Sequence, residues 1–243
     1  MHILLSNDDG VFAPGLAALA SALSKIAKVT VMAPESERSG FSSALTLDRP
    51  LRPLQLDNGF WSVNGTPADC VYLALNGFFG DDEPDFVVAG INSGANLGDD
   101  VIYSGTVGAA LEGRFLGKPA LAVSLAGPRV KHHTSPEAFA DAAELVRQLI
   151  MHWQELALPS HNIINMNIPD IPLTQIKGYR LTRLGKRQRG LSVSKSHDPR
   201  GRAVFWIGLM GEPAPGVENN DFEAIEQGYV SLTPLQTDLT SHD

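Results

Sequence analysis

The chain has few of the residues that build cross-linked, membrane-spanning or nucleic-acid-binding proteins. Its 243 residues include one cysteine, Cys70, so no disulfide can form within one chain. No apolar run approaches the roughly 20 residues needed to span a bilayer. Lys and Arg number 19 against 27 Asp and Glu, a net charge of −8, whereas duplex nucleic acid calls for a basic surface. We therefore expect no disulfide framework, no membrane segment and no duplex nucleic acid partner.

The sequence also shows no pattern for a zinc site, a cysteine nucleophile or a secretory signal. The seven histidines show no zinc-ligand spacing such as His-Glu-x-x-His. Cys70 lies in an apolar stretch, which predicts a core residue and not a nucleophile. The apolar residues begin at Ile3 with no charged segment before them, so no secretory signal is predicted and we expect a cytoplasmic protein.

Apolar runs alternate with helical segments over the first two thirds of the chain. Buried strands are predicted at residues 3–5, 29–33, 85–90 and 120–124, with an edge strand at 60–63. Helices are predicted at residues 16–26 and 67–79 and from about 106 and 135 onward. This alternation predicts an α/β fold with a mainly parallel sheet covered on both faces.

The pattern changes beyond Pro159. Strands are predicted at 163–168, 179–184, 204–209 and 229–232, with few helices between them. We therefore expect a core of residues 1–168 and a smaller β-rich extension of residues 169–243.

Two adjacent carboxylates, Asp8 and Asp9, follow the first predicted strand, and Gly10 marks the turn after them. In an open α/β sheet, ligands bind beyond the carboxyl ends of the strands. Neighbouring carboxylates repel each other unless a cation lies between them, and Mg²⁺ and Mn²⁺ prefer oxygen ligands. A cation site is one interpretation. An ordinary exposed acidic turn, or a helix cap, is the other.

A second polar segment, residues 90–113, follows a later predicted strand and is rich in Gly and Asn. Asn92 and Asn96 offer amide oxygens to a metal and N–H groups to an anion. Ser104-Gly105-Thr106 lies where a helix is predicted to start, and helix N-termini bind phosphate. An ordinary surface loop is the alternative, but long loops of this kind are usually functional. A metal on the first segment and a phosphate on the second would suit phosphoester hydrolysis.

Two charged segments have ordinary interpretations. Asp99 and Asp100 are expected to lie on the outside of the loop or to buttress it, with metal binding as a minor alternative. The cluster Lys186-Arg187-Gln188-Arg189 is typical of a solvated loop. The other hypothesis is that this cluster leans over an active site and attracts nucleotides or polyphosphate.

The chain resembles the SurE family of stationary-phase survival proteins, which are metal-dependent nucleoside monophosphate phosphatases. The resemblance rests on motifs at residues 6–10, 34–40, 64–71, 90–113 and 228–235. It implies a Rossmann-like three-layer core and a β-rich extension used for dimer or tetramer assembly. It also implies release of phosphate from nucleoside 5′- and 3′-monophosphates and, in some members, from short polyphosphate.

The same resemblance implies roles for individual residues. The implied ligands of one divalent cation per subunit, Mg²⁺ or Mn²⁺, are Asp8, Asp9, Ser39 and Asn92. The implied phosphate-binding residues are Asn96, Ser104, Gly105 and Thr106. A water activated by the metal would be the nucleophile, and Asp8 or Asp9 the base.

Two rival functions predict different residues. A non-catalytic Rossmann-type nucleotide-binding regulatory module would carry Gly-x-Gly-x-x-Gly in the first loop. A haloacid-dehalogenase phosphatase would carry a nucleophilic Asp in an Asp-x-Asp pattern. The first loop contains Asp8-Asp9 instead, so the sequence favours the metal-dependent phosphatase.

Overall fold

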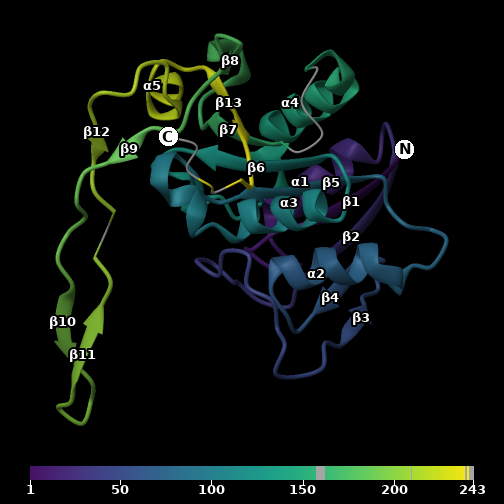
Figure 1. The fold of residues 1–243 in the computed structure, drawn as a ribbon, viewed down its shortest axis with the longest axis horizontal. Coiled ribbons are helices and arrows are strands. Elements are labelled where there is room, and N and C mark those ends of the chain that lie inside the picture. The colour runs from purple at the N-terminus through teal and green to yellow at the C-terminus, as the bar shows by residue number, and fades with distance from the viewer. Residues whose placement is uncertain (157–161, 209, 239, 241–243) are drawn as a thin grey trace.

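A nine-stranded sheet forms the centre of the molecule (Figure 1). The computed structural model describes residues 1–156, 162–208, 210–238 and 240. In spatial order the strands are β3 (Pro53–Gln55), β4 (Trp61–Val63), β2 (Lys28–Pro34), β1 (His2–Ser6), β5 (Phe86–Asn92), β6 (Ala120–Ala126), β7 (Ile163–Pro169), β13 (Val230–Leu235) and β8 (Tyr179–Leu181). The six strands from β4 to β7 are parallel to one another, whereas β3 and β13 are antiparallel to β4 and β7.

The chain reverses its direction of travel across the sheet at β1. From β1 it moves one way to β2, then returns to place β5 on the opposite side of β1. This reversal creates a crevice at the carboxyl ends of β1 and β5, the place where open α/β sheets bind ligands. The loop after β1 and the loop after β5 both open into this crevice.

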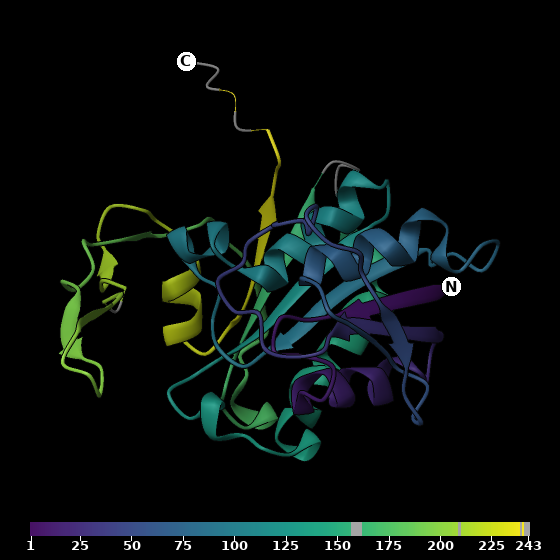
Figure 2. The ribbon, with the colours of Figure 1, turned by 90° about the horizontal axis from the view of Figure 1, so that it is seen from below.

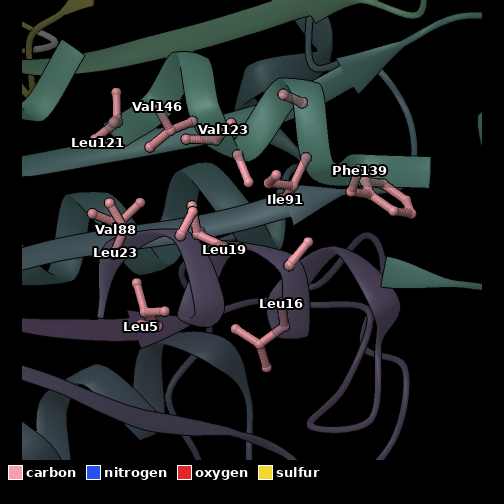
Figure 3. Packing of buried hydrophobic residues seen from close by; sticks show 14 of the residues in the cluster. Leu5, Leu16, Leu19, Leu23, Val88, Ile91, Leu121, Val123, Phe139 and Val146 are labelled. Carbon is pink, nitrogen blue, oxygen red and sulfur yellow. The ribbon is translucent and has the colours of Figure 1, made fainter. Parts of the chain in front are cut away.

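Helices cover both faces of the sheet, as Figure 2 shows. The helices are α1 (Pro14–Leu23), α2 (Pro67–Leu73), α3 (Gly105–Phe115), α4 (Ala140–Met151) and the short α5 (Asp221–Glu226). One core cluster joins α1 and α4 to the sheet, with Leu19, Val88 and Val146 fully buried (Figure 3). A second cluster joins α2 and α3 to the opposite face. Single-turn helices lie at Gly98–Ile102, Val130–His132, Pro136–Phe139, Trp153–Leu156 and Leu173–Gln175.

The predicted α/β core is confirmed, with three local differences. The strand at 61–63 is not the edge, because β3 pairs with its outer side. The helix expected over 67–79 leaves α-helical geometry at Asn76 and Gly77, within a π-helical segment at Ala74–Phe78. The helix expected from residue 135 begins as a 3-10 turn, so α4 starts only at Ala140.

Two strands of the C-terminal part belong to the main sheet. β13, residues 230–235, lies between β7 and β8. The last part of the described chain therefore completes the main sheet. Residues 186–208 and 210–214 form the arm, which extends from the body in Figure 1. Its strands are β9 (Lys186–Arg187), β10 (Ser194–His197), β11 (Ala203–Trp206) and β12 (Pro213–Ala214), paired as β9 with β12 and β10 with β11. The strand predicted to reach Leu209 ends at Trp206, and Leu209 lies outside the described residues. The division at residue 169 stays a prediction.

None of the helices in the described ranges is both long enough and apolar enough to cross a bilayer.

The first turn of α1 lies against the backbone of β5. A Cβ at Gly15 would lie 2.3 Å from the carbonyl oxygen of Ile91. Gly15→Ala should therefore lower the free energy of unfolding by about 1–3 kcal/mol, the usual cost of overpacking. This holds even though alanine favours helices by about 1 kcal/mol over glycine. Urea denaturation measures the change.

Ser21→Ala, an exposed change in the same helix, is the matched control and should leave stability unchanged or slightly higher. A Gly15→Ala protein that is more stable than the wild type would show that the helix does not need this close approach.

Candidate metal and phosphate site

The turn that carries the two carboxylates is closed by the side chain of Asn7. Its Nδ2 donates to the carbonyl oxygen of Gly10 at 2.9 Å, and its Oδ1 accepts from the Gly10 N–H at 3.2 Å. Gly10 has a φ of +101°, a conformation that side-chain-bearing residues rarely adopt. Asn7 and Gly10 thus form a local clamp that fixes Asp8 and Asp9 at the end of β1.

Asp8 is buried against the start of α3. The hydroxyl of Thr106 donates to Asp8 Oδ1 at 2.5 Å. A Cβ on Gly105 would lie 2.9 Å from the Asp8 Cβ, so glycine is what allows the helix to approach so closely. Burial raises the pKa of Asp8, while the hydrogen bond from Thr106 works in the opposite direction. The first predicted segment and the N-terminus of α3 therefore meet directly.

Asp9 points to the loop after β5. Its Oδ2 accepts from the backbone N–H of Ser93 at 2.9 Å. Burial, followed by the charge of Asp8, raises the pKa of Asp9 to about 6. The raised pKa values mean that ionising both neighbouring carboxyl groups is unfavourable. A cation between the two carboxylates would stabilise their ionised forms.

Asp9 lines a hollow of about 410 Å³ together with residues from three other loops. The lining residues are Asp9, Glu37, Ser39, Asn92, Ser93, Gly94, Ala95 and Lys131. Three of the four predicted metal ligands are among them, and the fourth, Asp8, adjoins Asp9. The predicted ligands therefore converge from the loops after β1, β2 and β5.

The loop after β2 is tied to the carboxylate turn. The backbone N–H of Arg38 donates to the carbonyl oxygen of Asp8 at 2.7 Å. This bond brings Ser39 to the hollow, where its hydroxyl donates to Glu37 Oε1 at 2.9 Å. Glu37 adds a third carboxylate near Asp9 and contributes to the raised pKa of Asp9.

The amide of Asn92 is oriented by its own loop. Its Nδ2 donates a hydrogen bond to the carbonyl oxygen of Gly94 at 2.7 Å. The side-chain oxygen is then the atom that would coordinate a cation. A register shift between Ala89 and Asn92 interrupts the pairing of β5 with β6 just before this residue. Such irregularities commonly re-aim side chains beside active sites.

The donor set fits a hard divalent cation. The four candidate ligands, Asp8, Asp9, Ser39 and Asn92, all offer oxygen, as Mg²⁺ and Mn²⁺ prefer. Within the described part of the chain, no three His, Cys, Asp or Glu side chains converge as a metal cluster. A cation here would therefore rely on hydroxyl, amide and water oxygens besides the two aspartates.

Asn96 is the centre of a buried hydrogen-bond network. Its backbone N–H donates to Asn167 Oδ1 at 2.9 Å, and its carbonyl oxygen accepts from the amides of Asn165 and Asn167 at 2.8 and 3.0 Å. Its own Nδ2 donates to the hydroxyl of Ser124 at 2.8 Å. Among the described residues lining the hollow, Asn96 and Ser104 do not occur. These contacts fix the loop, and the predicted phosphate contact of Asn96 stays a prediction.

Both hydroxyls at the start of α3 make hydrogen bonds inside the protein. Ser104 is the N-cap, and its Oγ accepts from the N–H of Val107 at 3.1 Å. The Thr106 hydroxyl donates to Asp8. The helix start can still offer backbone N–H groups and its positive dipole end to an anion.

Sequence reasoning missed several residues that shape this site. Asn7, Asn165 and Asn167 act through contacts that only the fold reveals. Lys131, in the turn after β6, brings a positive charge to the lining of the hollow, but a lone lysine gives no sequence signal. The Asn-Asp-Asp-Gly order could have pointed to Asn7, because asparagine often closes a turn onto the residues that follow it.

Asp99 and Asp100 buttress the loop, as expected. The Arg187 side chain bonds both carboxylate oxygens of Asp100, and the Arg187 backbone N–H donates to Asp99 Oδ2. The solvated-loop interpretation is thus wrong for Arg187, while Lys186 and Arg189 are exposed.

The chain is similar to one protein family over most of its length and to individual proteins over all of it. The family model described as Survival protein SurE matches residues 3–190. The 5′-nucleotidase SurE of Methylococcus capsulatus is 56% identical over 243 residues, covering 100% of this chain and 94% of that protein. That of Legionella pneumophila is 52% identical, covering 100% of this chain and 93% of the relative.

A solved structure is similar as well. The crystal structure of the SurE protein from Aquifex aeolicus matches with a TM-score of 0.84 and 39% sequence identity, covering 100% of this chain and 96% of that one. Together the family model, the full-length relatives and this structure show that the chain belongs to the SurE family.

Proposed function

We propose that this chain is a metal-dependent phosphatase that hydrolyses nucleoside 5′- and 3′-monophosphates to nucleoside and phosphate. The observation that carries the proposal is the meeting of Asp8 with the N-terminus of α3 beside the hollow lined by Asp9, Ser39 and Asn92. Full-length relatives named 5′-nucleotidase support the substrate class. Short polyphosphate, whose terminal phosphoryl group is similar, is a further expected substrate.

Individual residues would have separate roles in binding the metal, orienting the phosphate and accepting a proton. Asp8, Asp9, Ser39 and Asn92 would hold Mg²⁺ or Mn²⁺, one ion per subunit. When bound, such an ion neutralises charge on a phosphoryl group and lowers the pKa of a coordinated water.

The backbone N–H groups at the start of α3 would orient the phosphoryl oxygens, and Lys131 would attract the anionic substrate to the hollow. Asp9 is the more accessible of the two aspartates and would accept the proton of the attacking water. The cytoplasmic location remains a prediction.

The first test is phosphate release. Purified protein incubated with nucleoside 5′- and 3′-monophosphates should release inorganic phosphate, measured colorimetrically. EDTA should abolish the reaction, and added Mn²⁺ or Mg²⁺ should restore it, because the aspartate pair needs a cation to face a phosphate.

Activity that survives complete removal of metal would contradict the cation site. The rival regulatory module would bind nucleotides without releasing phosphate, which equilibrium binding measured beside the phosphate assay would detect.

The second test distinguishes a catalytic role of the Asp9 charge from a structural role of the Asp9 side chain. Asp9→Asn should lower kcat by about 100-fold or more, the scale on which loss of electrostatic or acid–base catalysis is measured. In EDTA the same change should raise Tm, because it removes a charge that burial and Asp8 disfavour. A gain of 1 kcal/mol corresponds to about 2–4 °C for a domain of this size.

Asp57→Asn, at an exposed site, is the control and should change neither kcat nor Tm. Wild-type turnover in Asp9→Asn would refute its place in the site. A lower Tm in EDTA would show that Asp9 is instead a structural turn residue.

We also propose that residues 169–243 mediate assembly into a homodimer or homotetramer. Exposed apolar side chains gather on the arm, and Phe205, Trp206 and Ile207 expose 62%, 68% and 96% of their surface. Solvent-exposed apolar patches of this kind mark protein interfaces. Since the family resemblance points to self-association, the expected occupant is a second copy of the chain.

Phe205→Ser combined with Trp206→Ser should therefore lower the mass measured by light scattering after size-exclusion chromatography. Ser196→Ala, in the same hairpin, should leave the mass unchanged. A double variant with the same mass as the wild type would place the interface elsewhere.

A further inference from the structure

The turn Gly98–Ile102 connects two parts of the candidate phosphate site. It follows Asn96 and ends two residues before Ser104, the N-cap of α3. Any shift of this turn would therefore move the loop leading into the helix whose N-terminus faces Asp8. Residues that are distant in the sequence, Arg187 and Asp221, bind this turn.

Arg187 holds the turn from the base of the arm. Its Nε donates to Asp100 Oδ1 and Oδ2 at 2.8 and 2.9 Å, and its Nη2 donates to Oδ2 at 2.5 Å. Its backbone N–H donates to Asp99 Oδ2 at 2.8 Å. The Arg187 and Asp100 side chains are only 21% and 16% exposed, so solvent screens this ion pair weakly.

The same arginine also fastens the arm. Its Nη1 donates to the carbonyl oxygen of Gly211, two residues before β12, at 2.8 Å. Its guanidinium lies 4.8 Å from the ring centre of Phe222 in α5. Arg187 in β9 therefore contacts the turn, α5 and the segment that leads into β12.

Asp221 reinforces these contacts. Its carboxylate accepts from the N–H of Gly98 at 2.7 Å and from the N–H of Gly185 at 2.9 Å. A Cβ at Gly98 would lie 2.6 Å from the Phe222 ring, so the turn and α5 are in close contact. The turn is thus bonded at its first residue by Asp221 and at its third by Arg187.

We propose that Arg187 is a positioning residue for the phosphate site, acting through Asp100. By fixing the turn Gly98–Ile102, it sets where the α3 N-terminus presents its N–H groups to the phosphoryl group. The inference rests on the proposed function. It predicts a loss of phosphate affinity without a comparable loss of metal affinity. Three candidate metal ligands, Asp8, Asp9 and Ser39, lie on other loops, and Asn92 lies at the end of β5, where Gly94 holds its side chain.

The guanidinium fork is essential to this role. Lysine would keep the charge but could not bond Asp100 through two nitrogens while reaching Gly211. Removing the arginine would leave the mostly buried Asp100 carboxylate without its ion-pair partner. The turn would then shift to expose this carboxylate to water. Small displacements of groups that orient a substrate cost large factors in rate.

The test compares Arg187→Met, Arg187→Lys, Asp100→Asn and the double variant Arg187→Met/Asp100→Asn with the wild type. KM, kcat, the inhibition constant of inorganic phosphate, the Mn²⁺ dissociation constant of metal-stripped protein, and Tm are measured. Both methionine and lysine variants should raise KM and the phosphate inhibition constant about tenfold. The Mn²⁺ dissociation constant should stay within about twofold.

The double variant should be no worse than either single one, because the two side chains act as one unit. Arg52→Met, at an exposed site near β3, removes the same charge far from the turn and should behave as wild type. If Arg187→Met does not fold, the lysine variant and Asp100→Asn carry the same test.

Any of the following outcomes would overturn this inference while leaving the proposed function intact: an unchanged phosphate inhibition constant, equal losses of phosphate and Mn²⁺ affinity, or additive effects in the double variant. A lysine variant with wild-type kinetics would show that charge attraction suffices, and would also overturn it. Failure of the wild-type protein to bind phosphate or hydrolyse any monophosphate would instead overturn the proposed function.

Discussion

The contact between the Asp8 carboxylate and the first turn of α3 is the constraint on which the rest of the site depends. It joins the end of β1 to a helix that begins almost a hundred residues later, and Gly105 is needed to make it possible. Once Asp8 is held there, Asp9 is placed in the hollow and the β2 loop is drawn over the turn by Arg38. One close approach thus brings carboxylates and a helix N-terminus together.

Charge at the site differs from the charge of the whole chain. The molecule carries a net charge of −8, and Asp8, Asp9 and Glu37 concentrate negative charge at the crevice. An anionic substrate could not approach such a surface by long-range attraction alone. Local positive groups have to reverse the sign over a few ångströms, and the α3 N-terminus and Lys131 are placed to do so. Local charge, and not the isoelectric point, decides what this crevice can bind.

The sequence predicted those features that depend on neighbours along the chain. Apolar runs located β1, β2, β5, β6 and β7, and α2 begins at Pro67, where the helix over 67–79 was predicted to start. Features built from distant residues escaped prediction. The asparagines of β7 reach Asn96 across about 70 positions, and Arg187 reaches Asp100 across 87. Neither pair has a periodicity or motif, because its geometry exists only after the sheet has formed.

The position of β13 has a consequence for how the molecule is made. This strand lies between β7 and β8, yet it consists of residues 230–235. During synthesis on the ribosome, the outer side of β7 therefore lacks its partner strand until residues 230–235 have emerged. An unpaired strand edge in a nascent chain invites association with other chains. The β7 edge is therefore the part of the growing sheet that stays open to such association until β13 is added.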